Sequence, residues 1–86
     1  MDGDGYEYIY KRTTASTSPS RPTEISQTDD FIPDGWADDP RGVTSTYIYE
    51  WVCVRKKTNG VWGGFSSPAV WAKFGQDGND GSDGAY

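Results

Sequence analysis

Histidine, disulfide-forming cysteine pairs and long apolar runs are all missing from this chain of 86 residues. It has no His and one Cys, and no apolar stretch approaches the ~18 residues of a membrane-spanning helix. Without an imidazole, neither a Cys–His nor a Ser–His nucleophile can form, and Cys53 has no internal disulfide partner. We therefore expect a chain that is not an enzyme, binds no metal or cofactor and does not insert into a membrane.

Basic residues are also few. Lys and Arg number 8 against 13 Asp and Glu, which gives a formal net charge of −5. Nucleic-acid binding requires clustered cations that release counterions from phosphates. The runs 11–12 and 55–57 lie at predicted strand ends, where we expect solvated side chains and no basic patch. Nucleic acid is therefore not an expected partner.

Aromatic residues, in contrast, are abundant. The chain has four Trp, six Tyr and three Phe, although apolar residues make up only 34% of it. A domain of this size buries little more than about 60% of its surface, and each aromatic side chain buries ~150–250 Å². We expect rings to supply most of the core.

Alternating and β-branched residues predict strands and no helix. Residues 6–13 place Tyr6, Tyr8 and Tyr10 on one face of a first strand. Residues 46–57 are the strongest candidate, and Asn59-Gly60 predicts a type I′ turn to a returning strand. A last strand is expected at residues 69–74, with Trp71 facing outward if its neighbours Val70, Ala72 and Phe74 face the core. A short strand is also expected within residues 24–32.

The remaining residues between the strands predict loops. Residues 14–23 are rich in Ser, Thr and Pro, and residues 33–42 combine turn residues with one Trp. We expect Trp36 to pin the second loop by packing. Cys53 is in phase with Tyr49 and Trp51, which predicts a buried small hydrophobe.

Both ends of the chain are rich in Gly and Asp. From residue 75 onward Gly occupies every third position, as a collagen triple helix requires. We divide the chain into a linker at 1–5, a β module at 6–74 and a collagen-like linker at 75–86. A flexible acidic tail is the competing interpretation of these termini. The pattern suggests a segment of a longer repetitive protein.

Carboxylates could in principle carry chemistry, but their spacing does not favour it. The pairs 29–30 and 38–39 are adjacent in turn sequences, whereas glycoside hydrolysis needs two carboxylates across a cleft. The side-chain oxygens of residues 77, 79, 80 and 83 could bind calcium, but their spacing does not follow that of an EF-hand loop. Turn and capping roles are the expected ones for these residues.

Two family resemblances appear along the chain. The aromatic run 47–55, the Asn59-Gly60 turn and the closing segment 61–68 resemble the last two strands of fibronectin type III-like domains. That resemblance implies a small antiparallel β-sandwich of the fibronectin type III or immunoglobulin-like class, or a sandwich with fewer strands. The whole arrangement, an aromatic β module between Gly-x-Asp triplets, resembles repeat modules of bacteriophage or prophage tail-fibre and tail-tip proteins.

The second resemblance implies a non-catalytic structural or spacer module in a virion tail or at a cell surface. Its partners would be neighbouring copies of the module and other fibre chains, in a homotrimeric parent. The alternative is a carbohydrate- or receptor-binding module, because exposed aromatic rings stack on sugars or pack against proteins. Its candidate binding residues are Trp36, Trp62 and Trp71, with a cell-surface glycan as a further partner.

Overall fold

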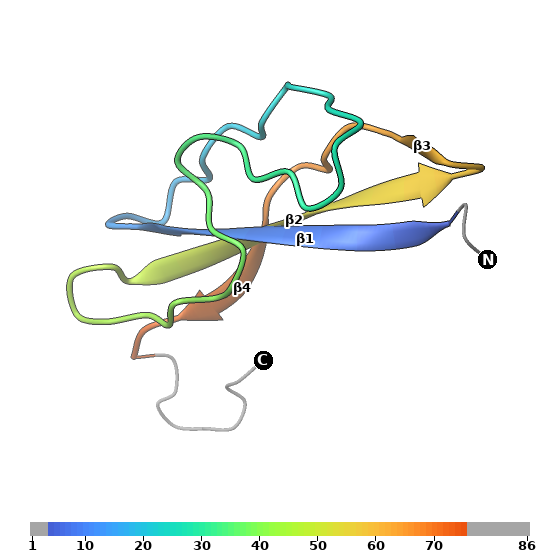
Figure 1. Ribbon diagram of the computed structural model, residues 1–86. Coiled ribbons are helices and arrows are strands. Elements are labelled where there is room, and N and C mark those ends of the chain that lie inside the picture. Colours follow the sequence, from blue (N-terminus) through green and yellow to red (C-terminus); the bar gives the residue numbers. More distant parts are fainter. Residues whose placement is uncertain (1–3, 76–86) are drawn as a thin grey trace.

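A computed structural model describes residues 4–75, which form one antiparallel sheet under a layer of irregular chain (Figure 1). Strand β1 (Gly5–Thr13) pairs along its whole length with β2 (Tyr49–Thr58). The two short strands β3 (Val61–Trp62) and β4 (Ala69–Lys73) both pair with the opposite edge of β2. β2 is therefore central, and the all-β prediction is confirmed.

The strands lie close to where alternation and turn residues predict them. The turn between β2 and β3 has φ angles of 52° at Asn59 and 84° at Gly60, and a type I′ turn needs positive φ at both positions. The predicted hairpin is thereby confirmed. Beyond β3 the chain stays bonded to β2, because Gly63 donates its N–H to the carbonyl of Lys56 at 3.0 Å and Ser66 donates its N–H to the carbonyl of Val54 at 2.8 Å.

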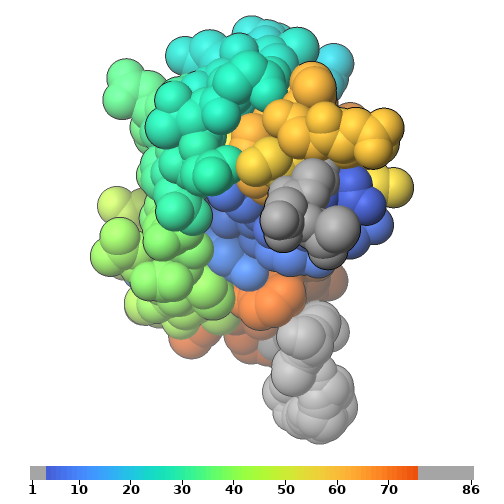
Figure 2. Space-filling model, turned by 45° about the vertical axis from the view of Figure 1, so that its right-hand side comes forward, coloured from blue at the N-terminus to red at the C-terminus, as the bar shows by residue number. Residues whose placement is uncertain are grey.

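Residues 14–48, here called the covering segment, contain no sheet strand. The first part of this segment arches over one face of the sheet, and the chain then crosses β1 toward the other face (Figure 1). The prediction of a short strand within residues 24–32 is wrong, because these residues form no strand. Among residues 4–75 the layer that faces the sheet is this segment, and no second sheet is present there. Figure 2 shows the segment (cyan to green) beside the surface of β1, part of which stays uncovered between it and β4 (orange).

The core lies between the sheet and the covering segment. Ile9 and Cys53 sit opposite each other on β1 and β2, and both are buried with Phe65. Three partly buried side chains of the covering segment pack against them, namely Phe31, Ile32 and Trp36. The expected burial of Cys53 and the packing role of Trp36 are confirmed.

The last strand departs from simple alternation. The register of β2 and β4 shifts between Glu50 and Trp51, which places Val70 opposite Trp51 and leaves Trp71 in the bulge. Trp71 is exposed, as expected, but so are Val70 and Phe74. The three neighbours do not share one face, because the bulge breaks the two-residue period: Val70 is on the side of Trp51, whereas Ala72 is on the side of Glu50.

The proposed linkers fall largely outside the described residues. The collagen-like triplets begin at Gly75, and residues 76–86 lie beyond the part of the chain that the structure describes, as do residues 1–3. Within residues 4–75 there is no helix of the length and apolarity that a membrane crossing requires.

Candidate functional site

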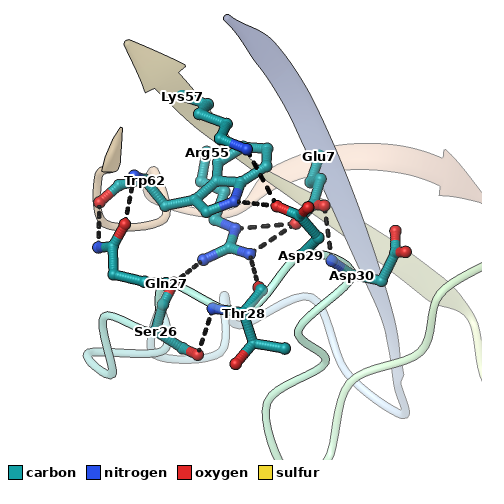
Figure 3. A network of polar contacts seen from close by, with 9 residues as sticks. All are labelled: Glu7, Ser26, Gln27, Thr28, Asp29, Asp30, Arg55, Lys57 and Trp62. Carbon is teal, nitrogen blue, oxygen red and sulfur yellow. Dashed lines mark hydrogen bonds and ion pairs between the residues drawn. The ribbon is translucent and has the colours of Figure 1, made fainter. Parts of the chain in front are cut away.

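The most deeply buried cation of the described chain is Arg55, which is 1% exposed. Its guanidinium donates to the carboxylate of Glu7 through Nε at 3.0 Å and through Nη2 at 2.7 Å. The same group donates to the carbonyls of Ser26 and Thr28 in the covering segment (Figure 3). Arg55 therefore joins β1, β2 and the covering segment at one point.

Aromatic rings enclose this ion pair. The guanidinium carbon of Arg55 lies 4.2 Å from the ring centroid of Trp62, 5.3 Å from that of Phe65 and 5.8 Å from that of Phe31. Rings around a desolvated guanidinium add cation–π attraction to its hydrogen bonds. The expectation that Arg55 is solvated at a strand end is wrong, because its side chain points to the same face as Cys53.

Trp62 is held in this cluster by polar groups of the covering segment. Its indole N–H donates to Asp29 at 2.7 Å, and its backbone exchanges hydrogen bonds with the side chain of Gln27 (Figure 3). The pKa of Asp29 is lowered, first by the hydrogen bond from Trp62 and then by Lys57. The contribution of Asp29 to stability is therefore present above the ordinary pKa of a carboxyl and is lost as the pH falls through the lowered value.

A second buried charge fixes the far end of the covering segment. Glu50 is 0% exposed, and its carboxylate accepts the backbone N–H groups of Arg41 at 2.6 Å and Gly42 at 2.9 Å. Tyr10 and Ala37 exchange backbone hydrogen bonds at 2.8 Å. Residues 35–42, here called the strap, therefore cross the outer edge of β1 and pass to the opposite face of the sheet.

The three tryptophans proposed as ligand-binding residues do not meet at one place. Trp62 is 5% exposed in the Arg55 cluster, Trp36 is half-buried against the core, and Trp71 lies on β4. The ring of Trp71 makes an edge contact with that of Tyr10 at 5.2 Å. A single aromatic platform built from all three is therefore not formed.

The face of the sheet opposite the core carries exposed rings. Tyr6 is 61% and Tyr8 50% exposed, and both share this face with Tyr10 and with Val54, which lies opposite Tyr8. Trp71 reaches the same face through its contact with Tyr10. We call this set of five residues the open face.

Two hollows flank the point where the strap crosses β1. One, of about 240 Å³, is lined by side chains that include Phe31, Ile32, Asp30 and Asp38. The other, of about 260 Å³, is lined by three rings and three cations, which are Tyr10, Trp36, Tyr47, Lys11, Arg12 and Arg41. We call it the cationic hollow. It contradicts the expectation that the basic residues form no patch, because Arg41 joins the other two through the strap.

The thiol of Cys53, the one cysteine of the chain, is buried and therefore poorly accessible to reagents. Burial raises the pKa of Cys53 to about 11, so the thiol stays protonated in the folded protein at neutral pH. We expect reagents for thiolates to label Cys53 slowly in the native state at pH 8 and quickly after unfolding in urea. Equal labelling rates in the two states would show that Cys53 is not buried.

The raised pKa also predicts a pH dependence of stability. The contribution of Cys53 to the free energy of unfolding is complete below the ordinary pKa of a thiol. It is lost as the pH rises from there toward about 11, because in that range the thiol ionises only in the unfolded chain. The free energy of unfolding should therefore fall more steeply with pH for the wild type than for Cys53→Val. That comparison cancels the titration of the tyrosines, and parallel curves would contradict the prediction.

Protein-family models, curated proteins and solved structures were all compared with this chain, and none of them matched it.

Proposed function

We propose that this chain is a non-catalytic structural module that contacts neighbouring copies of itself through the open face. The observation that carries this proposal is the exposure of Tyr6 and Tyr8 beside Val54 and Trp71, on the sheet face opposite the core. Rings gathered in this way are typical of surfaces that another protein covers. Scattered single apolar residues would not require such an explanation.

The resemblance to tail-fibre repeat modules supports the same role. In a phage or prophage fibre, copies joined by Gly-x-Asp linkers would lie side by side in a homotrimer, in the virion tail or at a cell surface. We also propose that the sheet is a reduced relative of the fibronectin type III-like sandwich, in which the covering segment replaces the second sheet. The buried Arg55 and Glu50 contacts support a spacer role, because they hold this irregular layer in one position.

Self-association of the full chain tests this proposal. Sedimentation of the wild type up to about 1 mM should show an assembly that dissociates on dilution, and Tyr6→Thr with Tyr8→Thr should remain monomeric. Threonine keeps the strand preference of these positions. Ile25→Thr is the matched control, since Ile25 is 64% exposed on the covering segment. A wild type that stays monomeric at all concentrations, or a control with the same effect, would overturn the proposal.

Carbohydrate binding is a second candidate function, and one observation favours it. The half-buried Trp36 borders the cationic hollow, where Tyr47 supplies a further exposed ring. Ligand-binding pockets commonly combine aromatic side chains with a few polar groups that orient the ligand, and a sugar ring can stack on such an aromatic side chain. The hollow shares Tyr10 with the open face but is not lined by Tyr6 or Tyr8, so substitutions at Tyr6 and Tyr8 test self-association without changing its lining.

A further inference from the structure

We infer that the cationic hollow binds a carboxylated saccharide, such as a hexuronic acid unit. The inference rests on the second candidate function and specifies its ligand. It starts from the charge of the lining residues, which include Lys11, Arg12 and Arg41 but no carboxylate. In a chain with a net charge of −5, three cations around one hollow form a local anion-attracting site.

These cations are available to a ligand. The ion pairs found within residues 4–75 join Arg55 to Glu7 and Lys57 to Asp29, and none involves the cations of the hollow. The nearby carboxylate of Glu50 is buried and is occupied by the backbone N–H groups of Arg41 and Gly42. An incoming carboxylate would therefore meet donors that no ion pair within residues 4–75 engages, although Asp38 and Asp39 lie close enough to contribute to the raised pKa of Tyr10, which also lines the hollow.

Aromatic contacts already hold two of the cations in place. The guanidinium carbon of Arg12 lies 4.3 Å from the ring centroid of Tyr47, and its Nη1 donates to the carbonyl of Gly42 at 3.3 Å. The ammonium of Lys11 lies 5.5 Å from the ring centroid of Trp36. Ordering the donors before binding lowers the entropic cost of binding.

The same rings favour a sugar over a simple anion. Tyr10, Trp36 and Tyr47 line the hollow, and their faces can pack against the C–H groups of a pyranose ring. A planar carboxylate on that pyranose could then accept two parallel hydrogen bonds from a guanidinium. A hexuronic acid combines both features in one unit.

Titrations of the full chain with small probes test the inference. Methyl β-glucuronide, added up to about 50 mM, should produce saturable amide and indole shifts at Trp36, Ala37 and Arg41 in ¹⁵N–¹H spectra. Methyl β-glucoside, acetate and phosphate should each bind at least about tenfold more weakly, because each lacks either the carboxylate or the pyranose. Absence of saturable shifts with the glucuronide would overturn the inference.

The comparison probes distinguish a carboxylated saccharide from simpler ligands. Equal binding of the glucoside would show a neutral sugar site, and equal binding of acetate or phosphate would show a plain anion site. Either result would overturn the assignment of a carboxylated saccharide. These probe titrations do not test self-association, which is measured by sedimentation without the probes.

Variants locate the binding. Arg12→Gln and Arg41→Gln should each weaken glucuronide binding by about tenfold, since each removes one charge-assisted donor. Lys56→Gln is the matched control. Lys56 is an exposed cation near Tyr6, and it does not line the hollow. Equal weakening by the control would mean that the probe responds only to overall charge, and would overturn the placement of the site.

Discussion

Arg55→Ala is expected to unfold the domain or to lower its free energy of unfolding by about 3–5 kcal/mol, the usual result of removing one partner of a buried ion pair. The variant leaves the carboxylate of Glu7 and the carbonyls of Ser26 and Thr28 without their common donor. Small domains are stable by only about 5–15 kcal/mol, so this loss is a large fraction of the total. Urea unfolding followed by tryptophan fluorescence measures it.

The size of the effect depends on which groups stay unpaired. Lys56→Ala is the neighbouring control and should change stability little, because Lys56 is exposed. The double variant Glu7→Leu with Arg55→Met removes both charges and should recover part of the loss. Recovery should be incomplete, since the two carbonyls still lack a donor. A stability of Arg55→Ala within about 1 kcal/mol of the wild type would show that the cluster is not a major support of the fold.

The sequence identifies the sheet because its signals are local. Alternation marks β1 and β2, and Asn59-Gly60 supplies the positive φ angles of the hairpin. These features depend on neighbouring residues, which a sequence shows directly. The bulge at Trp71 depends on pairing with β2 instead, so alternation alone wrongly places Val70 and Ala72 on one face.

The covering segment could not be predicted in the same way. Residues 24–32 contain strand-favouring residues, but the carbonyls of Ser26 and Thr28 bond to Arg55 and not to a neighbouring strand. Asp30 has a φ of 62°, which turns the chain. A side chain from β2 thus replaces the ladder that a strand would need.

A signal for the buried Arg55 is nevertheless present. Arg55 follows Trp51 and Cys53 at two-residue spacing, and Glu7 precedes Ile9 at the same spacing. Charges in phase with core residues on two strands can pair inside the protein. The following lysines at 56 and 57 hide this signal, because they make the run resemble a solvated strand end.

The cationic hollow illustrates a different limit. Lys11 and Arg12 are neighbours on one strand, but Arg41 is about thirty residues away in sequence and arrives only because the strap crosses β1. The crossing in turn depends on Glu50 and on the pairing of Tyr10 with Ala37. The candidate site is therefore a consequence of tertiary contacts, and its integrity should depend on Glu50.

Glu50→Ala is expected to release the strap and to lower the free energy of unfolding by about 2–4 kcal/mol, because two backbone N–H groups lose a charged acceptor in a buried site. Hydrogen exchange at the amides of Arg41 and Gly42 should become much faster, whereas the amide of Asp30, which donates to Glu7 at 2.7 Å, should keep its relative protection.

Glu50→Gln is the matched variant for this prediction. It preserves the shape of the side chain but places a neutral amide against two donors, so an intermediate loss of stability is expected. Both variants should also weaken glucuronide binding at the cationic hollow, because Arg41 is no longer held beside Arg12. Unchanged exchange at Gly42 in Glu50→Ala would contradict the role of Glu50, and would mean that the pairing of Tyr10 with Ala37 alone positions the strap.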